Sequence, residues 1–241
     1  MIGIDDIGLG ELFSAIGGLG LASFALVDTT KVLRSGGISH SGFGYIERTW
    51  NELAPPAGTL GGMSILQQSA RDTLHANWIN GMPMTDQKAI AKSLLKLALT
   101  RETAAHFATR TGVDTQALAE VADRMASGQA LSDVTDPQAS ARLATVFGRF
   151  DLALTAMLDA AYQRADQRYR NASKTMAALV SILLAIAGGA LLENQSGAQI
   201  VWQSVLLWAG CGILAVPLAP ISKDLASGLS AAVKVAQSVR R

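Results

Sequence analysis

The chain has 241 residues, a formal net charge of +1, 49% hydrophobic residues and 16% charged residues. Soluble domains usually carry about 25% charged residues, and a net charge near zero excludes strong electrostatic attraction to nucleic acid. The deficit of charge is local, because no charged residue lies between Lys174 and Glu193 or between Glu193 and Lys223. We therefore predict an all-α integral membrane protein with three transmembrane helices and a helical cytoplasmic insert.

The first apolar segment runs from Leu12 to Val27 and falls within an N-terminal region of residues 1–34. It is shorter than the roughly 20 residues that cross a bilayer core, so it either spans a thin region or lies in the interface. An interfacial helix needs a charged face, and this segment has no charge, which favours spanning. Small residues at every fourth position predict a helix-packing face: Ser14, Gly18 and Ala22.

Residues 35–136 have the composition of a soluble protein and carry many helix-boundary signals. Capping residues at Thr85, Thr100 and Asp114 predict three helix starts, and glycines at Gly112 and Gly128 predict two helix ends. No stretch alternates between apolar and polar residues over the length of a strand. We predict a cytoplasmic domain of short helices.

No motif in the chain indicates catalysis or cofactor binding. His40, His75 and His106 lack the spacing of a metal site, and a lone Cys211 makes no internal disulfide. The segment AAHFATRTGVDTQALAEV has the spacing of a helix-turn-helix, but its second helix is acidic and would repel phosphate. We predict a tight helical hairpin there, no enzyme activity, no metal or cofactor, and no nucleic-acid partner.

A single helix is predicted over residues 137–192, from the Asp136–Pro137 start signal into the second span. Its first part has an apolar seam that packs either on a partner helix or on the insert's own helices: Leu143, Phe147, Phe150, Leu154 and Met157. Its second part has small residues at every fourth position, which predict a second packing face: Ala177, Ser181, Ala185 and Gly189.

Residues 193–241 are predicted to form a short external loop, the third transmembrane helix and a cytoplasmic amphipathic tail. Pro217 and Pro220 should bend or end the third helix. Basic residues flank the cytoplasmic ends of the spans and an aromatic ring marks the opposite interface: Arg168, Arg170, Lys174, Lys223 and Trp202. These flanks predict insertion in the cell (inner) membrane, with the N-terminus outside and the C-terminus cytoplasmic.

Two functions fit these features. The first is a homo-oligomeric membrane anchor or scaffold whose cytoplasmic helices recruit a protein partner. The alternative is a pore-forming channel or membrane-disrupting effector that is gated through the cytoplasmic domain. No charged residue lies near the middle of a span, where ion and proton pathways usually place one. This argues against a coupled transporter, while a pore stays possible if several copies surround it with Ser14, Ser23, Ser181 or Gln203. The small-residue faces, the long seam and the lack of catalytic motifs make the anchor the preferred hypothesis.

Overall fold

The computed structural model describes residues 9–30, 34–56 and 63–239, and this part of the chain contains helices and no strand. It divides into two compact units. The helical insert comprises residues 39–169, and the apolar unit comprises residues 1–38 and 170–241. The longest helix, α7 (Pro137–Ser196), contributes its first part to the helical insert and its second part to the apolar unit.

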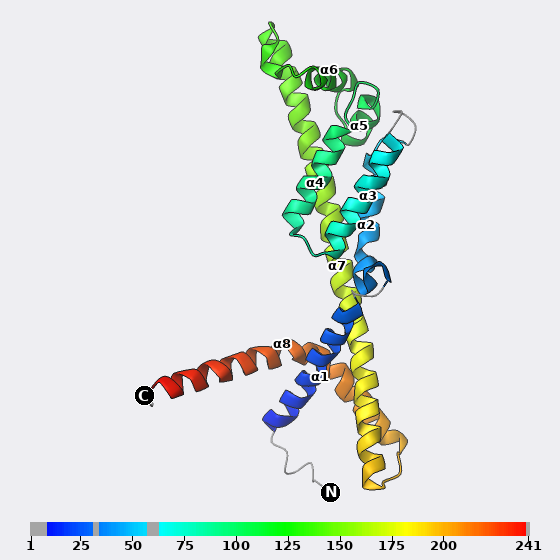
Figure 1. The fold of residues 1–241 in the computed structure, drawn as a ribbon, viewed down its shortest axis with the longest axis vertical. Coiled ribbons are helices and arrows are strands. Elements are labelled where there is room, and N and C mark those ends of the chain that lie inside the picture. The colour runs from blue at the N-terminus through cyan, green and yellow to red at the C-terminus, as the bar shows by residue number, and fades with distance from the viewer. Residues whose placement is uncertain (1–8, 31–33, 57–62, 240–241) are drawn as a thin grey trace. The chain divides into compact units, whose positions relative to one another are not determined.

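In the helical insert, five helices gather along the first part of α7 (Figure 1). A short 3₁₀ turn, η4 (Leu131–Asp133), precedes α7. The five helices are α2 (His40–Leu53), α3 (Met63–Ile79), α4 (Met84–Leu97), α5 (Ala104–Thr111) and α6 (Thr115–Ala126). The sequence predicted α4, α5 and α6 but named neither α2 nor α3. Ser39 is the N-cap residue of α2, but its side chain makes no capping hydrogen bond.

Two of the predicted helix starts are confirmed. The Asp114 carboxylate accepts a hydrogen bond from the backbone N–H of Ala117 at 2.7 Å, which satisfies one of the free donors in the first turn of α6. The Asp136 carboxylate likewise accepts from the N–H of Gln138 at 2.9 Å, and α7 begins at Pro137. Gly112 and Gly128 have φ of 69° and 68°, the left-handed conformation expected after a helix.

The other two predicted starts are wrong. α4 begins at Met84 because the carbonyl of Pro83 accepts from the N–H of Gln87 at 3.1 Å, so Thr85 is already helical. Thr100 lies in the turn before α5, whose N-cap is Thr103. The Thr103 hydroxyl donates to the carbonyl of Ala98 at 2.7 Å in the turn between α4 and α5.

The core of the helical insert lies between α7 and the shorter helices. Phe107 and Phe150 meet edge to face with ring centroids 5.7 Å apart, a favoured aromatic geometry. Apolar residues from α2 to α6 surround them and form one continuous core. A smaller cluster of Ala117, Val121 and Leu143 fills the end of the insert between α6 and α7.

The apolar unit contains α1 (Leu9–Thr29), the second part of α7 and α8 (Trp202–Val239), with a 3₁₀ turn, η3 (Arg34–Ser39), leading towards the insert. Each of the three α-helices has a stretch long and apolar enough to cross a membrane. The stretch in α1 is Leu12–Thr29, and the stretch in α8 is Trp202–Ile221. Three candidate spans were predicted from the sequence, and their existence in helices of this length is confirmed.

Pro217 and Pro220 lie inside α8 and do not end it. A proline keeps a helical φ and removes one backbone donor, so a helix passes through it with a local disturbance. Figure 1 shows α8 running beside the second part of α7 and then changing direction towards its C-terminus. The described helix is therefore bent and continuous.

Candidate functional site

The contacts among the three apolar helices depend on glycines at which no side chain would fit. A Cβ atom at Gly212 of α8 would lie 2.6 Å from the Cα of Ile182 in α7, and one at Gly189 of α7 would overlap the Trp208 ring of α8. Real Cβ atoms do not approach backbone this closely, so α7 and α8 meet at backbone distance. Such contact replaces the hydrophobic driving force that is missing between helices in lipid.

A buried hydrogen bond joins the same two helices. The hydroxyl of Ser181 is fully buried and donates to the carbonyl of Gly212 at 2.8 Å. The absence of a side chain at Gly212 thus allows the α7 backbone to approach α8, and the Gly212 carbonyl accepts the hydrogen bond from Ser181. Ala177, one turn earlier on α7, is fully buried as well.

Helix α1 packs on α8 through another glycine. A Cβ atom at Gly20 would overlap the carbonyl oxygen of Ala215 and lie 3.0 Å from the Cβ of Ala219. Ser23 is buried on the same side of α1, and its hydroxyl donates to the carbonyl of Leu19 at 2.8 Å within the helix. Val27 continues this buried side.

The two predicted packing faces therefore differ in the structure: the α7 face makes contacts within the chain, and the α1 face does not. In α7, Ala177 and Ser181 are buried and Gly189 lies against Trp208, while Ala185 is partly exposed. In α1, the buried side is offset from the predicted one, and Gly18 has nothing within 4 Å of the position of its Cβ. The predicted α1 residues are all exposed: Ser14, Gly18 and Ala22.

Sequence reasoning missed Gly20, Gly212 and Trp208, although a signal was present. In α8, small residues occur at Gly212, Ala215 and Ala219, with spacings of three and four. That pattern places them on one face of a helix. Its short repeat is less conspicuous than the four-residue repeats of the other two spans.

The predicted interface residues are at the surface where the structure describes their side chains. Arg168, Arg170 and Lys174 are exposed along α7, and Trp202 at the start of α8 is 72% exposed. The side chain of Lys223 lies outside the described residues. Pro217 and Pro220, the predicted bend residues, are exposed on α8.

The apolar seam of α7 contacts the insert's own helices. Phe150 and Leu154 are fully buried in the main core, and Leu143 belongs to the smaller cluster. Phe147 and Met157 pack against the main core and are partly buried. Of the two hypotheses for this seam, the structure favours internal packing.

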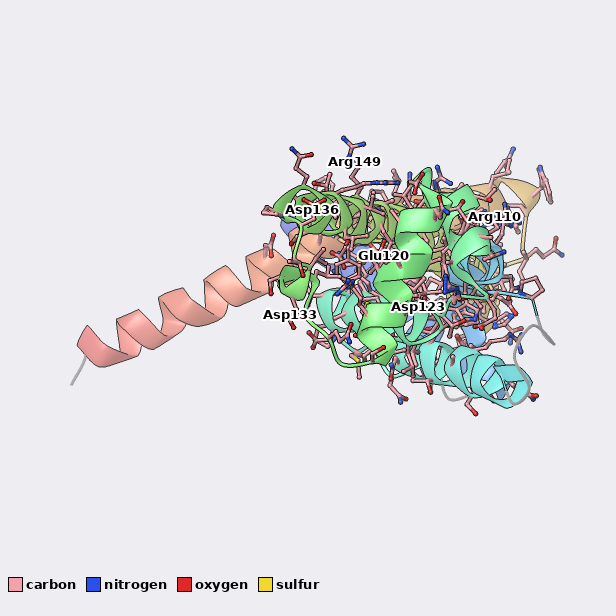
Figure 2. The ribbon with its side chains drawn as sticks, turned by 90° about the horizontal axis from the view of Figure 1, so that it is seen from above. Arg110, Glu120, Asp123, Asp133, Asp136 and Arg149 are labelled. Carbon is pink, nitrogen blue, oxygen red and sulfur yellow. The ribbon has the colours of Figure 1, made fainter. Side chains whose placement is uncertain are left out.

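A cleft of about 700 Å³ lies between α6 and the start of α7 and is lined mainly by charged and amide side chains. Arg101 and Asp123 form an ion pair across it at 2.7 Å. Figure 2 shows Glu120 and Asp123 on α6, and Asp133 and Asp136 on the segment that leads into α7. The carboxylates that line the cleft are those of Glu120, Asp123 and Asp136, and the guanidinium groups of Arg101 and Arg142 line it as well.

The N-cap of α6 also links it to α7. Arg142 lies 3.1 Å from Asp114, so this carboxylate contacts both a helix N-terminus and a guanidinium. The N–H of Ala117 and then Arg142 hold the pKa of Asp114 below its ordinary value. Farther along α7, Asp159 pairs with Lys88 of α4 at 2.5 Å.

The described residues contain no group of three or more His, Cys, Asp or Glu side chains that could hold a metal ion.

The ring of His75 contacts two other rings, with its centroid 4.7 Å from that of Phe43 and 5.8 Å from that of His40. Burial, followed by the nearby His40, lowers the pKa of His75. His106 contacts the carbonyl of Leu53 at 3.2 Å, which holds α5 against the end of α2.

Comparison with protein-family models, curated proteins and solved structures found no match for this chain.

Proposed function

We propose that this chain is a multi-pass membrane anchor or scaffold whose helical insert recruits a protein partner. The observation that carries the proposal is the surface of the apolar unit, where large aliphatic side chains point outward. Contiguous apolar surface of this kind marks a membrane or protein interface. The exposed side chains on α7 and α8 include Leu179, Leu183, Leu206, Leu207, Ile213 and Leu214.

The charge distribution supports one orientation in the membrane. Arg168, Arg170 and Lys174 stand on α7 immediately before its apolar stretch, and positively charged flanks favour the cytoplasmic side. Trp202 is exposed at the start of α8, where an amphipathic ring suits the opposite interface. We place the insert in the cytoplasm and the N-terminus outside, in the cell (inner) membrane.

Assembly with other copies of the chain is supported by the exposed side of α1. Ser14, Gly18 and Ala22 leave open space there, and small residues at this spacing allow close helix contacts in lipid. The corresponding side of α7 is already covered by α8 at Ser181. A second copy would therefore bind α1 in preference to the buried side of α7.

Cysteine labelling tests the orientation. In a Cys211→Ala background, Ser196→Cys should react with a membrane-impermeant maleimide in intact cells, because residues 193–198 are expected outside. Ser132→Cys, which is exposed in the insert, should react only after the membrane is permeabilised. The reverse pattern would contradict the proposed orientation, and labelling of both sites in intact cells would exclude a cytoplasmic insert.

Ion flux into proteoliposomes distinguishes the anchor from a channel. Ser23 and Ser181 are fully buried among the helices of one chain, and their hydroxyls donate to carbonyls there, so neither side chain faces a space enclosed by several copies. We expect purified full-length protein to give no more flux than empty liposomes. Native mass spectrometry in detergent should meanwhile show more than one copy. Steady or triggered flux would reject the pure anchor in favour of a pore.

A further inference from the structure

Trp78, near the end of α3, contacts both places at which the chain passes between the helical insert and the apolar unit. Ser39 is the first residue of the insert and Tyr169 is the last. The indole Nε1–H of Trp78 donates to the carbonyl of Ser39 at 2.7 Å. The same ring meets the ring of Tyr169 nearly at right angles, with centroids 6.4 Å apart. One side chain therefore touches the entry and the exit of the insert.

The surroundings of Trp78 leave its ring little freedom. The ring of Tyr162, a fully buried residue of α7, lies 6.5 Å from it between centroids. A Cβ atom at Gly42 of α2 would lie 2.7 Å from the Trp78 ring and would overlap the carbonyl oxygen of Ala165. Glycine at position 42 thus lets the first turn of α2 approach both α7 and the indole.

Neighbouring contacts hold the same turn of α3 against α2. The His75 ring, one turn before Trp78, meets the rings of Phe43 and His40. These contacts join α2 to α3, whereas Trp78 also reaches α7 through Tyr162 and Tyr169. The arrangement ties three helices together at one end of the insert.

We propose that Trp78 is an aromatic clasp that holds the entry and the exit of the insert at a constant spacing. Its hydrogen bond positions Ser39, and its ring contacts with Tyr162 and Tyr169 position α7. Loss of the indole should release the first turn of α2 from α7 and leave the α4–α6 end of the insert unchanged. This inference concerns the insert alone and goes beyond the proposed function.

Distances between paired spin labels in the full-length Cys211→Ala protein test the clasp. One pair, Gly44→Cys with Gln167→Cys, reports on the clasped end; Gly44 has nothing within 4 Å of its Cβ position and Gln167 is exposed. The second pair uses two exposed alanines, Ala105 on α5 and Ala144 on α7, and reports on the far end. Double electron–electron resonance should give one narrow distance distribution for each pair of labels in the parent protein.

In Trp78→Ala, we expect the distribution at the clasped end to shift and broaden while the distribution at the far end stays as in the parent. Trp78→Phe, which keeps a ring and loses the N–H donor, should give an intermediate broadening. An unchanged distribution at the clasped end would overturn the clasp. Equal broadening at both ends would also overturn it, because Trp78 would then be an ordinary core residue.

Two further variants keep the test decisive if Trp78→Ala fails to fold. Gly42→Ala adds one methyl group where the Ala165 carbonyl and the indole leave no space, so the clasped end alone should broaden. Trp50→Phe changes the buried tryptophan of α2 and should not broaden the clasped end selectively. Narrow distributions at the clasped end in both Trp78→Phe and Gly42→Ala would reject the proposal.

Discussion

Gly212→Leu is expected to separate α8 from α7 and to lower the thermal stability of the apolar unit. The new side chain would begin 2.6 Å from the Cα of Ile182 and 2.9 Å from the carbonyl oxygen of Ser181. Both atoms belong to backbone, which cannot move aside as a flexible side chain can. The helices must part, and the hydrogen bond from Ser181 to Gly212 is lost with their contact.

Overpacking of a close contact typically costs about 1–3 kcal/mol, and we expect the upper end of this range for Gly212→Leu. Unfolding of the full-length protein in detergent, followed by circular dichroism, measures the effect. Gly210→Leu is the matched control, because nothing lies within 4 Å of its Cβ position. Equal losses in the two variants would show that leucine disturbs α8 by itself and would reject the packing contact.

The glycines of α1 extend this experiment from packing within the chain to assembly between chains. Gly20→Leu should destabilise the unit, since its side chain would overlap the carbonyl of Ala215 in α8. Gly18→Leu should leave stability nearly unchanged but reduce the copy number seen by native mass spectrometry if the exposed side of α1 binds another copy. An unchanged copy number in Gly18→Leu would remove α1 from the proposed oligomer contact.

Phe150→Ala should produce the largest loss of stability in the helical insert. Phe150 is fully buried on α7 and meets Phe107 of α5 edge to face. Truncation removes that contact and leaves a cavity among helices that can collapse only in part. Replacement of a buried phenylalanine by alanine costs about 3–5 kcal/mol. Chemical unfolding of the full-length protein, followed by tryptophan fluorescence, measures this loss.

Leu152 provides the control on the same helix. Its side chain is 68% exposed, and substitutions at exposed positions usually change stability by less than about 0.5 kcal/mol. Leu152→Ala should therefore unfold like the parent. A loss comparable to that of Phe150→Ala would mean that another chain covers the exposed side of α7 in solution.

Capping residues in the sequence were sufficient to predict a helix start where one side chain caps that helix. Asp114 and the Asp136–Pro137 pair begin α6 and α7 as predicted, because a carboxylate beside free N–H groups caps a helix wherever it lies. Thr100 does not begin α5, whose N-cap is Thr103, three residues later. The prolines in α8 were predicted to bend or end that helix, and it bends without ending (Figure 1), since a proline disturbs the helix locally.

The sequence by itself determined which segments are long and apolar enough to cross a membrane, and where charge flanks them. These properties depend on composition along the chain, so they can be read without knowing what lies beside each residue. Only the tertiary structure decided which side of each helix makes contact. Helix α1 has small residues on two sides, at Gly18 and at Gly20, and the position of Ala215 in α8 selects Gly20. Trp78 likewise acquires its contacts with Ser39 and Tyr169 only when three helices meet. The periodicity of one helix cannot specify the position of its neighbour, because that position depends on how side chains and backbone of both helices fit together.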